Sequence, residues 1–154
     1  MAHGDCKAAI EYLKKELDLE PEDTDVLLSM GSMLLSLGDA DTALQCFLQS
    51  LDADENNAQV YYYLGLAAVM RQELANAKDF FESALKLDPQ SPAILRDMAQ
   101  LHLLLGDTET ALHHAAKAVQ CSGGDPEIAK HYRRIRFKHL VCRIRGKLDI
   151  TSNS

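Results

Sequence analysis

The chain has few aromatic residues and no long apolar run. Aromatic residues make up 6% of its 154 residues, and none is tryptophan. No apolar run approaches the roughly 18 residues that a membrane-spanning helix needs. Residues 1–15 lack the charged start and apolar block of a secretory signal. We therefore expect a cytoplasmic protein. Its 47% hydrophobic content, rich in Ala and Leu, favours a compact all-α domain.

Closely spaced cysteine pairs are also absent. The four cysteines, Cys6, Cys46, Cys121 and Cys142, lie far apart and form no C-x-x-C pair. This spacing favours free thiols in a reducing compartment over a disulfide framework.

No group of residues has the spacing of a catalytic, metal or cofactor site. His113 and His114 are adjacent on an expected helix, so they point about 100° apart and cannot chelate one ion together. The segment 52–55 lacks the glycine and the distant glutamate of a calcium loop. Gly123-Gly124 lacks the following Lys-Ser/Thr of a phosphate loop. We expect no enzyme, no cofactor and no metal.

The charge is unevenly distributed. The whole chain carries −7, but residues 126–154 hold eight Lys and Arg against two acids, a net +6. The preceding 125 residues carry −13. An acidic body with a basic end can mark an interaction segment.

A step of 34 residues recurs along the chain. It relates Met30-Gly31, Leu64-Gly65 and Met98-Ala99. The same step relates Ala43, Ala77 and Ala111, and then Phe47, Phe81 and Ala115. A fixed period of this length predicts stacked copies of one structural repeat.

Each repeat is predicted to form two helices. In the central copy, residues 59–71 and 73–87 place apolar side chains at steps of three and four, the spacing of one helical face. Asp88-Pro89 ends the second helix, because proline disfavours helix in the residue before it. Gly38 and Gly106 stand where the first helix of their repeats turns back, and glycine there can take the left-handed conformation.

These positions resemble the tetratricopeptide repeat family. The central copy carries the resemblance in Tyr61-x-x-Leu64-Gly65-x-x-Ala68, Ala77-x-x-x-Phe81-x-x-Ala84 and Pro89. The resemblance implies a right-handed superhelix of antiparallel helix pairs. It divides a single domain, 1–148, into a leading half-repeat (5–18), three repeats (24–57, 58–91 and 92–125) and a basic capping helix (126–148), followed by a frayed tail (149–154).

We expect eight helices and no strand. The first repeat has Glu55 in place of the closing proline. The third repeat departs further, with Ala99 for glycine, His102 for an aromatic residue and Ala115 for phenylalanine.

The resemblance also implies a concave groove, lined by the first helices, that holds a partner peptide or amphipathic helix. Most groove positions here are apolar or aromatic, which is typical of a binding face. The alternative is that the C-terminal helix covers the groove, which would make Tyr62 and Tyr63 core residues. The groove positions are Leu28, Ser32, Leu35, Tyr62, Tyr63, Leu66, Val69, Met70, Arg96, Gln100, Leu103 and Leu104.

One class of partner is disfavoured. Family members that hold the acidic tails of chaperones use Lys, Asn and Arg on this groove. The matching positions here are Leu28, Ser32, Tyr63, Ala93 and Asp97, none of which can bind a carboxylate in that way. We expect no clamp for an acidic chaperone tail.

The basic end carries two apolar stripes instead of the single stripe of a capping helix. One stripe would dock on the last repeat, and the other either touches solvent, folds against the groove or meets a partner. That partner is a second copy of the chain, another protein or an anionic membrane surface; nucleic acid is disfavoured. The docking stripe is Ile128, Tyr132, Ile135, His139 and Cys142, and the second interface is Phe137, Val141, Ile144 and Leu148.

The sequence therefore predicts a protein–protein interaction adaptor or scaffold. One alternative is a small chaperone of the bacterial secretion type, which Tyr63-Leu64-Gly65-Leu66 faintly resembles. Another is a regulatory or interaction domain cut from a larger enzyme or membrane-associated protein.

Overall fold

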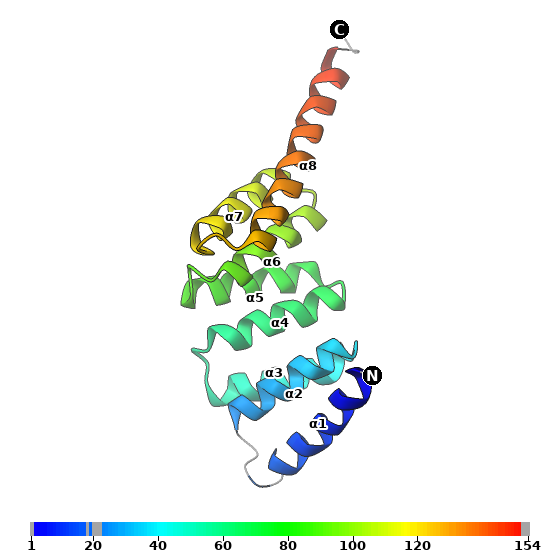
Figure 1. Ribbon diagram of the computed structural model, residues 1–154, viewed down its shortest axis with the longest axis vertical. Coiled ribbons are helices and arrows are strands. Elements are labelled where there is room, and N and C mark those ends of the chain that lie inside the picture. Colours follow the sequence, from blue (N-terminus) through cyan, green and yellow to red (C-terminus); the bar gives the residue numbers. More distant parts are fainter. Residues whose placement is uncertain (1, 18, 20–22, 152–154) are drawn as a thin grey trace. The chain divides into compact units, whose positions relative to one another are not determined.

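The structure, a computed structural model, describes residues 2–17, 19 and 23–151. This part of the chain contains eight α-helices and no strand (Figure 1), which confirms the predicted all-α class. The helices are α1 (Ala2–Leu17), α2 (Thr24–Ser36), α3 (Ala40–Ala53), α4 (Ala58–Met70), α5 (Leu74–Leu87), α6 (Pro92–Leu104), α7 (Thr108–Cys121) and α8 (Pro126–Thr151).

The chain divides into two compact units, residues 1–88 and 89–154. In the N-terminal unit, α2 packs on α3 and α4 on α5, while α3 also packs on α4 and α1 on α2. In the C-terminal unit, α6 packs on α7, and α8 packs mainly on α7 and also on α6. The helix pairs are those expected of the repeats. The assignment of all repeats to one domain stays a prediction.

The last helix is longer than expected. It continues to Thr151, past the predicted end at Leu148. Residues 152–154 of the predicted frayed tail lie outside the described part of the chain. Among the helices that the structure describes, none is both long enough and apolar enough to cross a membrane.

Helix starts repeat with the same 34-residue step. Asp23 Oδ1 accepts hydrogen bonds from the backbone N–H groups of Asp25 and Val26, at 3.0 and 3.1 Å. Asn57 and Asp125 accept the corresponding pairs at the starts of α4 and α8. Each side chain satisfies N–H groups that a helix start leaves unpaired. These caps fix where α2, α4 and α8 begin, whereas Ser91 before α6 makes no side-chain cap bond.

Turns between the helices of a pair also recur. Gly38 and Gly106 take the left-handed conformation, with φ of 86° and 83°. At the matching position of the central repeat stands Gln72, with φ of 63°. The turn geometry therefore holds even where the glycine is replaced.

The two helices of a pair meet at a glycine and a phenylalanine. A Cβ atom on Gly65 would lie 2.5 Å from the ring of Phe81, and one on Gly31 would collide with the ring of Phe47. Both rings are fully buried. Because interiors are close-packed, each ring occupies the space that the missing side chain leaves.

The third helix pair has different residues at the point where its two helices meet. Ala99 and Ala115 replace the glycine and the phenylalanine, and both lie in one buried cluster with Ala111. A methyl group is much smaller than a phenyl ring, and the larger side chains of this cluster are Leu103 and Ile135. The two positions that depart from the repeat pattern thus belong to one buried cluster.

This pairing predicts a strong coupling between Gly65 and Phe81. Gly65→Ala alone should destabilise the protein by ~1–3 kcal/mol through overpacking, less the gain in helix propensity. Phe81→Ala alone should cost ~3–5 kcal/mol through a cavity. Together they should cost less than their sum by at least ~1 kcal/mol, measured by urea denaturation. Gly31→Ala with Phe81→Ala is the matched control and should be additive. Additivity for both pairs would contradict the packing argument.

Candidate partner-binding surfaces

The N-terminal unit has a shallow hollow on the surface that α2 and α4 share. Its volume is about 250 Å³. Three predicted groove residues, Leu28, Ser32 and Tyr63, come together in its wall. The complete lining is Asp25, Leu28, Ser29, Ser32, Gln59 and Tyr63, with no Lys or Arg.

Tyr62 and Tyr63 form part of an aromatic array. The ring of Tyr63 stacks on buried Phe47, with centroids 5.2 Å apart and planes 9° apart. Tyr62 lies 5.4 Å from Tyr63 and 6.1 Å from Phe81, tilted to both. Both tyrosines are half-buried. Each ring is therefore held by the core while part of it stays on the surface, which suits a rigid contact residue.

The rest of α4 adds apolar surface. Its thirteen residues include no charged side chain. Leu66 and Val69 are half-buried, and Met70 is 46% exposed. A helix that is apolar all round is expected either inside a core or at a binding face. On α2, Leu35 is half-buried, whereas Leu28 is only 6% exposed and belongs to the same buried cluster as Ile10.

In the C-terminal unit, α8 packs over part of the predicted groove. Arg134 donates a hydrogen bond from its terminal nitrogen to Gln100 Oε1 at 3.0 Å. Leu103 is buried in a cluster with Ile135, and Tyr132 packs against that cluster. In this unit, therefore, the last helix covers the predicted groove at Gln100 and Leu103, as one of the two alternatives expected.

The two other groove positions of this unit differ from each other. Leu104 is 54% exposed. Arg96 forms a two-pronged ion pair with its neighbour Asp97, at 2.8 and 2.9 Å. The groove positions of this unit therefore do not form one continuous apolar face.

The first apolar stripe of α8 docks as expected over most of its length. Ile128 and Ile135 are buried, and Tyr132 is half-buried. His139 Nδ1 lies 3.2 Å from the hydroxyl of Thr108 on α7. Cys142, the next member of the stripe, is exposed. The contacts of this stripe with α6 and α7 therefore end after His139. Figure 1 shows α8 extending past these two helices.

The second apolar stripe lies open. Phe137 is 69% exposed and Ile144 50%, while Val141 is half-buried. Leu140, which the sequence analysis did not include, is 53% exposed and borders the same stripe. The fourth predicted member, Leu148, lies outside the described side chains.

A second hollow, of about 340 Å³, lies between α6 and α8. The sequence did not predict this hollow, because its lining combines Arg96 of α6 with residues at the start of α8, one repeat later. Burial, and then the charges of Arg134 and Arg96, hold the pKa of His131 below its ordinary value. Its lining is Arg96, Asp125, Glu127, Ile128, Lys130, His131 and Arg134.

Histidines and acidic residues gather into no metal site in the part of the chain that the structure describes. His102, at the position usually held by an aromatic residue, is 7% exposed and stacks on His114 at 5.5 Å. It is a core residue of the third pair.

Stacked antiparallel helix pairs with a fixed sequence step define a helical-repeat protein. Family models described as tetratricopeptide repeat match residues 1–58, 28–92 and 68–135. The chain belongs to the tetratricopeptide repeat family. The recognition from sequence is thereby confirmed.

Known proteins support the same assignment. BBSome complex member BBS4 of Xenopus tropicalis is 31% identical over 105 residues, which are 68% of this chain. The matched segment is 20% of BBS4, so the chain spans about a fifth of that relative.

Solved structures show the same fold. A tetratricopeptide repeat protein of Thermus thermophilus, TTC0263, superposes with a TM-score of 0.78 at 19% identity, over 90% of this chain and 76% of that one. A crystal structure of MamA gives 0.71 at 21% identity, over 91% and 92%. At these identities the likeness concerns the fold alone.

The two stripes of α8 should differ sharply in their effect on stability. Ile135→Ala removes a fully buried side chain and should cost ~2–5 kcal/mol. Phe137→Ala removes a larger but exposed side chain and should change stability by less than ~0.5 kcal/mol. Thermal or urea unfolding followed by circular dichroism measures both. A larger loss for Phe137→Ala would show that the docked and open stripes are interchanged.

Proposed function

We propose that this chain is a protein–protein interaction adaptor or scaffold whose partner segment binds on the face shared by α2 and α4. The tetratricopeptide fold is a non-enzymatic interaction module, which supports the general role. The observation that carries the specific proposal is the half-buried pair Tyr62 and Tyr63, of which Tyr63 lines a hollow of about 250 Å³.

The character of this face suggests the partner. The helix α4 has no charge, and Leu66, Val69 and Met70 continue the apolar surface along it. An amphipathic helix or an extended apolar peptide would bury this surface, and the rim residues Asp25 and Gln59 offer polar contacts. Because Tyr63 is already stacked on Phe47, little side-chain entropy is lost when a partner covers it.

The proposal also covers the location of the protein and its lack of enzymatic activity. We propose a cytoplasmic protein without enzymatic activity of its own, in line with the free Cys46, Cys121 and Cys142. A second candidate is an interaction domain within a longer protein, which the match to one-fifth of BBS4 favours. Immunoblotting of the native protein separates the two, because only the second predicts a larger native mass.

A double substitution tests the binding face. Tyr63→Glu with Leu66→Glu should abolish capture of groove-bound partners in a pull-down, because two carboxylates would be buried in the interface. Leu66→Glu alone is the milder variant if the double variant unfolds. The matched control is Leu48→Glu with Leu87→Glu, which places the same charges on exposed apolar residues of α3 and α5. Equal loss of the same partner in both would contradict the proposal.

Acidic chaperone tails should not be partners of this face. The hollow between α2 and α4 contains no Lys or Arg and includes Asp25, so a terminal carboxylate meets no cation there. Isothermal titration with an acidic C-terminal peptide, and with its amidated form as control, should show no difference at physiological salt. Micromolar binding that depends on the free carboxylate would contradict this prediction.

A further inference from the structure

The open face of α8 combines apolar and cationic side chains. Along it lie Phe137, Leu140, Val141 and Ile144, of which all but Val141 are at least half-exposed. At 100° per residue these four side chains fall within one sector, opposite the docked Ile135. The face is independent of the α2 and α4 surface.

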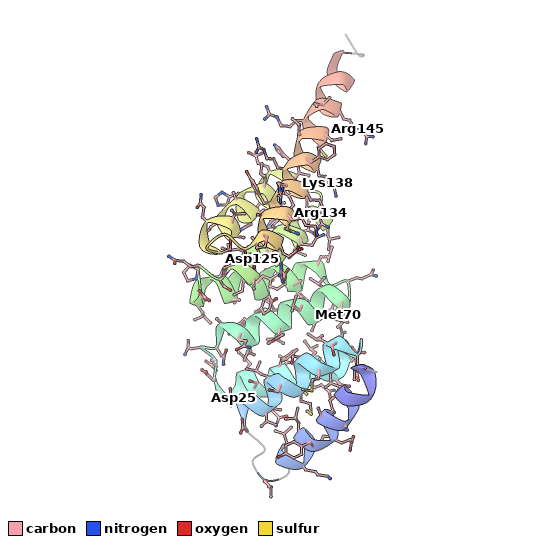
Figure 2. All side chains as sticks on the ribbon, in the orientation of Figure 1. Asp25, Met70, Asp125, Arg134, Lys138 and Arg145 are labelled. Carbon is pink, nitrogen blue, oxygen red and sulfur yellow. The ribbon has the colours of Figure 1, made fainter. Side chains whose placement is uncertain are left out.

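Cations flank this stripe on both sides. Arg136 and Arg143 fall on one flank, and Arg134, Lys138 and Arg145 on the other. All five are exposed. Residues 128–145 contain no Asp or Glu. Figure 2 shows Arg145 on the part of α8 that extends past α6 and α7, and Lys138 nearer to these helices. The matching surface is therefore anionic.

A helix packed as α7 packs on α6 does not fit this face. The 34-residue step places Arg133 where Gly31, Gly65 and Ala99 stand. At that position even a Cβ atom collides with a ring in the first two repeats. A large side chain there prevents the close approach of a second helix.

A second copy of α8 does not fit either. Two such helices would bring rows of five cations together without an acid between them, which is unfavourable. An acidic partner helix would avoid this repulsion. However, such a helix would meet the same obstacle at Arg133, which stands where the helix pairs of this chain have a small residue.

We propose that the open face of α8 binds an anionic membrane surface, with the apolar stripe in the interfacial region and the flanking cations at the lipid headgroups. The membrane affinity of an interfacial helix comes from buried apolar area together with attraction between its cations and anionic lipids. The open face of α8 supplies both, and long Arg and Lys side chains reach outward from its edges. The docked stripe lies opposite, so the rest of the C-terminal unit faces away from the lipid. The class of ligand is an anionic lipid headgroup in a bilayer.

Vesicle binding by the full chain tests this directly. Sedimentation should show binding to phosphatidylcholine vesicles in which about a third of the lipid is phosphatidylserine, and at least tenfold weaker binding to phosphatidylcholine alone. Phe137→Gln with Ile144→Gln should reduce binding at least tenfold, because both side chains supply the buried apolar area. The matched control, Leu48→Gln with Leu87→Gln, should bind as wild type. Circular dichroism checks that each variant is folded.

The cations have their own test. Arg136→Gln with Arg145→Gln should weaken binding about tenfold or more at low salt, where each cation near an anionic surface contributes most. Lys78→Gln with Lys86→Gln removes two exposed or partly exposed cations from α5 and should leave binding unchanged. If both pairs of substitutions weaken vesicle binding equally, binding depends only on the net charge of the protein. That result would overturn the proposed site.

The absence of tryptophan in the sequence allows a direct view of insertion. Phe137→Trp introduces a single reporter whose emission should shift to the blue on adding anionic vesicles and be quenched by brominated lipid. Leu48→Trp should show neither change. Vesicle binding without a shift at residue 137 would overturn the proposal.

Other occupants give distinct results. If the face instead joins two copies, wild type sediments as a dimer that Phe137→Gln with Ile144→Gln dissociates, and the vesicles do not bind. If the open face of α8 instead binds an acidic protein, the wild-type chain is monomeric and does not bind vesicles. Either result overturns the membrane proposal and leaves the α2 and α4 function untouched.

Discussion

The close approach of two helices at a residue without a side chain is the constraint on which this array depends. At Gly31 and Gly65 the neighbouring ring of Phe47 or Phe81 occupies the space of the missing Cβ. This contact sets the distance between the helices of a pair. The pair distance in turn places Tyr63 over the ring of Phe47, at 5.2 Å, where the next pair begins. The candidate binding face is therefore built on the same contact that closes the first two helix pairs.

Much of this architecture is predictable because a fixed step repeats a fixed geometry. The 34-residue step predicted the helix pairs, and the caps Asp23, Asn57 and Asp125 fall on that step, although Ser91 between them makes no side-chain cap bond. Side chains follow less directly. Ala99 and Ala115 look like two separate departures from the pattern, and only the structure shows that they lie in one buried cluster with Leu103 and Ile135.

The groove was harder to predict than the fold. Register alone assigns Leu28 and Leu103 to the groove, yet both are buried, since burial depends on which helix lies above them. For Leu103 that helix is α8, whose Ile135 and Tyr132 complete the cluster. The hollow between α6 and α8 escaped prediction for a related reason. It requires residues one full repeat apart, such as Arg96 and Lys130, to be considered together.

Helix α8 shows how one substitution in a repeat changes the use of a surface. Its first turns follow the repeat, because Arg134 stands one step from Gln100 and donates a hydrogen bond to it. At the position reserved for a small residue, however, it carries Arg133. The face that α7 covers on α6 cannot be covered in the same way on α8. Phe137 and Ile144 on that face thus stay exposed among cations. The apolar surface that pairs helices elsewhere in the array is here turned outward, while residues 1–125 remain acidic.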